Sequence, residues 1–266
     1  MNIGKNAHFI FRQQVRKKKH SDMLLPRSFL APHGGISYFL CGESFKTNIY
    51  IQNYFPLLTD STDAGARWSV DIYNANGEHV EKQSGTLRGK GGVVITIADE
   101  KKYGAYGMVW VKIALHDEEY TAAKPFGTIF FTELSRKTEQ KTLKILMHSL
   151  GFPMASRYDY DRTATGLMLP PESVPHLIYA NGSELHGAVA SCTATFVNRA
   201  HASLAVVLPS VPHSLGVQKI DLFKTEPKLS AHIGNDPFSI RLSGKNILGK
   251  PLLIMQGEGT FKGDHL

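Results

Sequence analysis

Short runs of β-branched and aromatic residues recur along most of this chain, roughly every 8–12 residues, and turn-forming residues separate them. The sequence WSVDIY, from Trp68 to Tyr73, alternates apolar and polar side chains as a half-buried strand does. The pair Asn76-Gly77 then supplies the left-handed turn of a tight hairpin. Regularly spaced short strands are typical of antiparallel sandwiches and barrels, whereas parallel sheets require helices between strands. The sequence therefore predicts a mainly antiparallel all-β protein.

One short phrase occurs twice in the chain, as MLLPRSFLAPH in residues 23–33 and as MLPPESVPH in residues 168–176. Three further pairs of signals follow in the same order in both halves. They are strand-like runs that end near Asn53 or contain Asn198, glycine-led strands from Gly92 and Gly216, and Lys-Pro pairs from Lys124 and Lys250. Each match alone is weak, but their common order predicts an internal duplication of a unit large enough to bury its own core.

We therefore expect two tandem, duplicated β-sandwich-like domains, residues 22–134 and 166–266, joined by one short connecting helix. The helix is predicted within residues 135–165, where TEQKTLKILMHSLGF has apolar residues at i, i+3, i+4 and i+7. These residues are Leu143, Leu146, Met147 and Leu150. A polar linker completes this segment.

The basic balance of the chain lies in its N-terminal tail. The net charge is +7, and residues 1–21 contain six basic residues and no acidic residue, so the rest of the chain is nearly neutral. The run Arg16, Lys17, Lys18 and Lys19 could contact nucleic acid, but we expect no such binding by the folded body, which shows no matching basic face. No apolar run is long enough for a membrane span, and we expect a cytoplasmic protein.

Motifs that would indicate a cofactor or a metal are missing from the sequence. There is no nucleophile elbow, phosphate-binding loop or dinucleotide fingerprint. The chain has two cysteines, Cys41 and Cys192, too few for a disulfide framework, and we expect both to be buried free thiols. Twelve histidines are present, but their spacing matches no metal-binding pattern in the His-rich second half. We therefore expect no cofactor and no metal.

Polar residues that recur at matched points of the two halves are the candidate ligand-binding residues. A histidine follows a proline at the entry to each half, an asparagine ends the first long strand of each, and two further histidines lie in the second half. The candidates are His33, Asn53, His176, Asn198, His186 and His201. The structural alternative is that Pro-His fixes a strand entry and that asparagine supports a turn.

These observations favour a non-enzymatic tandem β-sandwich module that binds a ligand or builds an assembly, with a glycan or a protein as the partner and homo-oligomerisation as one form of assembly. Tyrosines such as Tyr50 could stack on sugar rings. The alternative is an enzyme that acts on a carbohydrate or small metabolite at the domain junction, using histidine and carboxylate groups. Convergence of His176, His186, His201 and His213 would favour that alternative.

Overall fold

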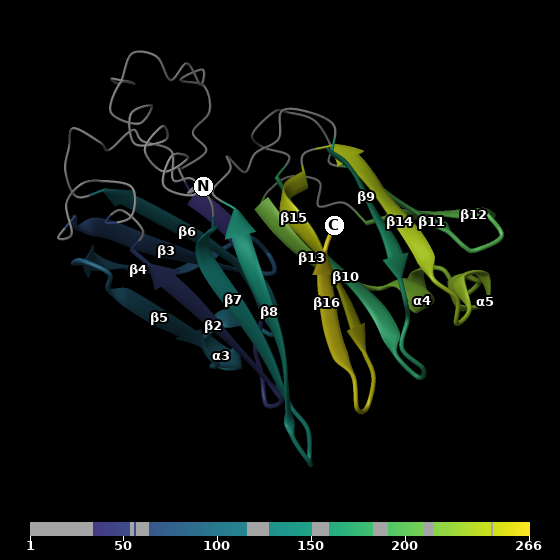
Figure 1. The fold of residues 1–266 in the computed structure, drawn as a ribbon, viewed down its shortest axis with the longest axis horizontal. Coiled ribbons are helices and arrows are strands. Elements are labelled where there is room, and N and C mark those ends of the chain that lie inside the picture. The colour runs from purple at the N-terminus through teal and green to yellow at the C-terminus, as the bar shows by residue number, and fades with distance from the viewer. Residues whose placement is uncertain are drawn as a thin grey trace, which may run out of the picture.

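The computed structural model of the 266-residue chain describes residues 34–53, 56, 64–115, 128–150, 160–182, 191–209, 215–245 and 247–266. Within these residues, sixteen strands form four four-stranded sheets (Figure 1). Every strand pair is antiparallel. The prediction of a mainly antiparallel all-β fold is confirmed.

The first half of the molecule consists of two sheets. Sheet A has the order β1-β6-β3-β4, and sheet B has the order β5-β2-β7-β8. The strands are β1 (Gly34–Leu40), β2 (Phe45–Gln52), β3 (Ala66–Asn74), β4 (His79–Leu87), β5 (Gly92–Ile97), β6 (Tyr106–Leu115), β7 (Thr128–Lys137) and β8 (Thr142–Leu150). One helical turn, α3 (Glu100–Tyr103), follows β5.

The second half also consists of two sheets. Sheet C has the order β13-β10-β15-β16, and sheet D has the order β12-β11-β14-β9. The strands are β9 (Tyr160–Leu167), β10 (Val174–Gly182), β11 (Ser191–Val197), β12 (Ser203–Leu208), β13 (Leu215–Asp221), β14 (Phe238–Lys245), β15 (Ile247–Gln256) and β16 (Phe261–His265). Two short helices, α4 (Leu222–Thr225) and α5 (Leu229–Ile233), follow β13.

The strand order of the first half is repeated in the second. Replacing each strand by the strand eight positions later converts sheet B into sheet C and sheet A into sheet D. The connection after β5 repeats as well, because Asp99 caps α3 and Asp221 caps α4, each accepting two backbone N–H bonds. This arrangement is what a tandem duplication would leave.

The structural repeat agrees with some of the matches made between the two halves of the sequence and differs from others. Gly92 begins β5 and Gly216 lies in β13, which are counterparts. Asn53 follows β2 whereas Asn198 follows β11, the counterpart of β3, so these two residues are not equivalent. Residues 23–33 and Lys124 lie outside the described residues. Short identities shift easily by one strand because neighbouring strands share a similar composition.

The predicted connecting helix is wrong, because residues 142–150 form strand β8. Leu143, Ile145 and Met147 alternate along the strand and face apolar neighbours in the other half, while Leu146 is 65% exposed. The segment satisfies the helical and the strand period at once, and pairing with β7 decides between them. The first repeat therefore extends through β8, and the second begins at β9.

Three apolar cores stabilise the fold. One lies between sheets A and B, and another lies between sheets C and D. The third, which we call the shared core, joins the two halves where β1 and β8 lie beside β15 and β16 (Figure 1). Its buried members are Ile36, Tyr38, Leu40, Met108, Leu134, Ile145, Met147, Ile178, Ala180, Val217, Leu248, Leu252, Ile254 and Phe261.

Strands next to the shared core are buried on both faces. In β10, Leu177 and Tyr179 point into the core of the second half, while Ile178 and Ala180 point into the shared core. Such strands have continuous apolar sequences instead of alternating ones. The run LIYA of β10 and the run PLLIM of β15 are explained in this way.

Tyr38 ties the halves together at an irregularity in sheet C. The β10–β15 ladder shifts register between Ile178 and Ala180. The hydroxyl of Tyr38 lies at this bulge, where it accepts from the Ala180 N–H at 3.0 Å and donates to the Leu248 carbonyl at 3.1 Å. Arg136 adds a second link, because its guanidinium donates to the carbonyls of Gly257 and Thr260. The two halves therefore form one packed unit.

Candidate functional site

The candidate asparagines have structural roles in their immediate surroundings. Asn53 is buried, and its side-chain amide donates to the carbonyls of Ala64 and Gly89, both at 2.7 Å. Asn198 lies in the turn after β11, where its side chain accepts from the Ala202 N–H at 3.0 Å and donates to the His232 carbonyl at 3.1 Å. Each asparagine thus satisfies the backbone of a loop.

Of the candidate histidines, the structure describes His176 and His201. His176 is half-buried on β10, and burial together with the charges of Lys219 and Lys224 lowers its pKa. His201 is exposed in the β11–β12 turn, in the same turn as Asn198, with a positive φ of 61°. His33, His186 and His213 lie outside the described residues, so the convergence of the second-half histidines stays a prediction.

Neither the cysteines nor any cluster of metal-ligating side chains forms a reactive site in the described ranges. Cys41 and Cys192 are buried free thiols, and burial raises their pKa values to about 11 and about 12. Among the described residues, no group of three or more His, Cys, Asp or Glu side chains could hold a metal ion. No helix in the described ranges has the length and apolar character to cross a membrane.

The open face of sheet B carries a regular arrangement that the sequence analysis did not recognise. Ile49 and Ile51 of β2 point inward, so the alternating residues Lys46, Asn48 and Tyr50 point outward. Strand pairing places these outward side chains in three rows across β5, β2, β7 and β8. The aromatic row is Val94, Tyr50, Phe131 and His148; the amide row is Thr96, Asn48, Glu133 and Leu146; the lysine row is Lys46, Ser135 and Lys144.

Hydrogen bonds fix the amide row in place. Glu133 accepts from the Asn48 amide, the Ser135 hydroxyl and the Lys144 ammonium group, each at 3.1 Å. The Thr96 hydroxyl donates to the Asn48 carbonyl oxygen at 2.9 Å. Such a network holds its side chains in one orientation before any ligand arrives.

Glu133 remains ionised in this network. Burial disfavours its charged form, but the hydrogen bonds from Lys144, Asn48 and Ser135 outweigh that effect and bring its pKa below the ordinary value. A general acid at neutral pH requires a raised pKa. The carboxylate is therefore suited to accepting hydrogen bonds and not to donating a proton.

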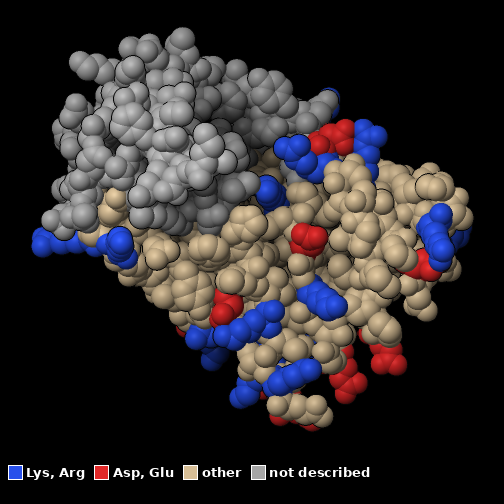
Figure 2. Space-filling model, viewed as in Figure 1, with Lys and Arg blue, Asp and Glu red and all other residues tan. Residues whose placement is uncertain are grey.

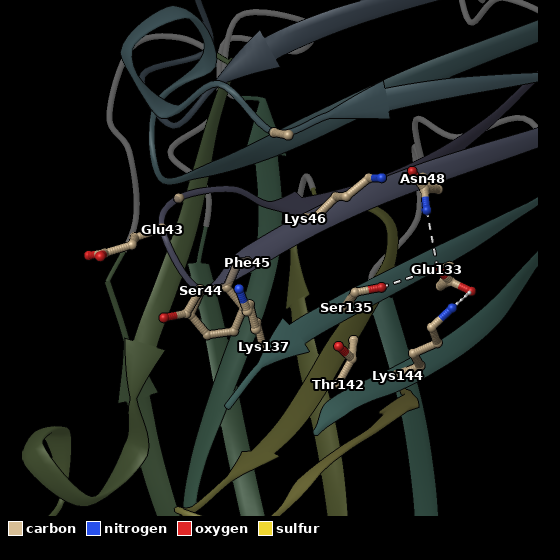
Figure 3. Close-up of a pocket in the computed structure, with 12 residues that line it drawn as sticks. Glu43, Ser44, Phe45, Lys46, Asn48, Glu133, Ser135, Lys137, Thr142 and Lys144 are labelled. Atoms are coloured by element: carbon tan, nitrogen blue, oxygen red, sulfur yellow. Dashed lines mark hydrogen bonds and ion pairs between the residues drawn. The ribbon is translucent and has the colours of Figure 1, made fainter. Parts of the chain in front are cut away.

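A cavity of about 490 Å³ opens at the lysine row, between the β1–β2 loop and strands β2, β7 and β8 (Figure 3). Lys46, Lys137 and Lys144 line it, together with Ser44 and Thr142. Lys144 is paired with Glu133, whereas Lys46 and Lys137 have no ion-pair partner among the described residues. The carboxylate of Glu43 points away from this cavity in Figure 3. The cavity therefore presents uncompensated positive charge.

A second cavity, of about 910 Å³, lies at the junction of the two halves. The tips of the β7–β8 and β15–β16 hairpins, at residues 138–141 and 258–260, line it together with the β9–β10 turn at residues 171–172, and all three project at the lower end of Figure 1. Figure 2 shows basic and acidic side chains together at this end of the molecule. The described lining contains four glutamates and no histidine, so it does not assemble the histidine–carboxylate pair that the enzymatic alternative expects.

The chain matches no known protein family. No curated protein matches it either.

Proposed function

We propose that this protein is a non-enzymatic tandem β-sandwich module that binds a glycan on the open face of sheet B. The observation that carries the proposal is the placement of an aromatic row directly beside a hydrogen-bonded amide row. Sugar rings have apolar faces and hydroxyl edges, so a surface of this kind satisfies both at once.

The aromatic row supplies the apolar contact. Tyr50 lies directly opposite Phe131 in the β2–β7 pair, and both side chains are half-buried, so each retains some accessible surface. Val94 extends the row on the β5 side and is 51% exposed. Together they form a flat strip on which a pyranose ring can lie.

The amide row supplies directional hydrogen bonds. Asn48 and Glu133 are nearly buried and already oriented by their neighbours, so binding need not order them. Affinity rises when the cost of ordering side chains is removed in advance. The shared core adds to this rigidity because it prevents the two halves from moving independently.

A glycan array tests the proposal. The unmodified protein is expected to retain a subset of defined oligosaccharides, and Tyr50→Ala is expected to reduce their affinity at least about tenfold because a stacking contact is lost. Phe223→Ala is the matched control, since Phe223 is a half-buried aromatic residue of α4 in the second half and packs against neither sheet B nor the shared core. Equal losses in both variants, or no retained glycan, would overturn the proposal.

The same experiment addresses the two other readings. Release of new reducing ends from a retained oligosaccharide would favour the enzymatic alternative. Capture of protein partners that the Tyr50→Ala variant still binds would favour protein recognition elsewhere on the molecule.

A further inference from the structure

The lysine row continues from the amide row into the cavity of Figure 3. Lys46 is two residues before Asn48 on β2, and Ser135 is two residues after Glu133 on β7, so they extend the same outward face. Lys137 and Thr142 close the lower side, at the start of the β7–β8 hairpin. We call Lys46, Lys137, Ser44, Ser135 and Thr142 the lysine pocket.

The lysine pocket differs in charge from the rest of the face. The carboxylate of Glu133 already accepts three hydrogen bonds and is paired with Lys144, so it does not neutralise a second lysine. Lys46 and Lys137 have no carboxylate partner in the described ranges. In Figure 3 the Lys46 ammonium group points towards Asn48 and the Lys137 ammonium group towards Ser44, so the lining carries two separate positive charges. An anion beside either ammonium group is attracted by it.

Hydroxyl groups complete the set of donors. Ser44 and Thr142 are exposed residues of the lining and can donate to an anionic oxygen, as the ammonium groups do. Carboxylate and sulfate oxygens accept several such bonds at the same time. The pocket is thus suited to a negatively charged group more than to a neutral hydroxyl.

Spacing connects the pocket with the aromatic row. Tyr50 and Lys46 are four residues apart on one strand, which corresponds to about 13 Å at the usual rise per residue. A short oligosaccharide spans such a distance. One ring can therefore lie on Tyr50 while a charged group of another ring lies in the pocket.

We propose that the lysine pocket binds the carboxylate or sulfate group of an acidic glycan whose neighbouring rings contact the aromatic row. This inference rests on the proposed glycan binding and adds the class of ligand. The protein would then distinguish charged chains from neutral chains of the same backbone.

Matched ligands test the inference by calorimetry on the full chain. Polygalacturonate oligomers are compared with their methyl esters, which have the same rings without the charge, and dextran sulfate is compared with dextran. At least one acidic member is expected to bind about three- to tenfold more tightly than its neutral partner, the range expected for two exposed ion pairs. Raising the salt concentration is expected to reduce this preference.

Charge reversal locates the effect. Lys46→Glu/Lys137→Glu is expected to abolish the preference for the acidic member over its neutral partner. The control Lys90→Glu/Lys262→Glu changes the net charge equally at exposed sites outside the pocket and is expected to retain the preference. Loss of the preference in both variants would show a general charge effect and would overturn the inference.

The remaining outcomes separate the two proposals. Equal binding of acidic and neutral members refutes the lysine pocket and leaves glycan binding intact. Absence of binding to every glycan refutes the proposed function itself. Binding of polyglutamate as tight as that of the acidic glycans would refute the inference in favour of an acidic protein segment.

Discussion

Replacing Tyr38 by phenylalanine removes one oxygen atom from the junction of the two halves. The ring is 1% exposed and remains in the shared core, so little apolar burial is lost. The hydroxyl, however, is hydrogen-bonded to Ala180 and Leu248 across the junction. The variant therefore isolates the polar part of the contact.

The expected loss of stability follows from the two groups left behind. The Ala180 N–H and the Leu248 carbonyl would lose this partner in a buried environment, at about 1–3 kcal/mol for each group. For the two groups together we expect a loss of about 2–6 kcal/mol in the free energy of unfolding. That is a substantial part of the stability of an ordinary protein.

Equilibrium urea unfolding measures this loss. Because the shared core couples the halves, we expect one transition at a lower midpoint and an unchanged denaturant dependence. Tyr103→Phe is the matched control, since its hydroxyl donates to Glu81 at 2.5 Å within the first half, and that carboxylate can be hydrated instead. We expect less than about 1 kcal/mol for this control.

Two results would refute the reasoning. A loss below about 0.5 kcal/mol for Tyr38→Phe would mean that water or another group satisfies the bulge as well as the hydroxyl does. Two separate transitions in the unmodified protein would mean that the halves unfold independently and that the shared core does not couple them.

Three further predictions concern burial. Cys41 and Cys192, with pKa values raised to about 11 and about 12, should react with a thiol reagent at pH 8 only at the rate of unfolding; fast reaction of the native protein would contradict their burial. Ile145 is 6% exposed and Leu146 is 65% exposed. Thermal unfolding should therefore show that Ile145→Asp lowers the free energy of unfolding by at least about 3 kcal/mol and Leu146→Asp by less than about 1 kcal/mol. The reverse order would favour the helical interpretation of this segment. Burial lowers the pKa of His265 to about 4, so between pH 6.5 and pH 4 the unfolded chain binds a proton that the native protein does not. The free energy of unfolding should therefore fall by up to roughly 3 kcal/mol as the pH decreases across that window. An equally steep fall in His265→Gln would exclude this histidine as the cause.

The sequence allowed the fold class to be predicted because strand periodicity is a local property. Alternation in residues 68–73 and the Asn76-Gly77 turn correspond to β3 and the β3–β4 hairpin. The β8 segment was misjudged because its apolar residues fit both the helical and the strand period. Hydrogen-bonded pairing with β7 decides in favour of the strand. Local patterns do not contain that information.

The candidate site was harder to predict for the same reason. Tyr50 was noted as a residue that could stack on a sugar, but its row is assembled from four strands, of which β7 and β8 alone are consecutive in the sequence. Asn48 and Glu133 become neighbours only through the β2–β7 pairing. The alternation of the polar or aromatic residues Lys46, Asn48 and Tyr50 with inward residues along β2 was the one available signal.

A duplicated binding protein often has two equivalent sites and gains affinity by engaging both. In this molecule the repeat is used unequally, because the face of sheet C that corresponds to the open face of sheet B is buried in the shared core through Ile178 and Ala180. One copy of the face serves cohesion, and the other is the open face on which we propose glycan binding. Under that proposal each chain offers one such face, and avidity for a repetitive polymer would require several chains acting together.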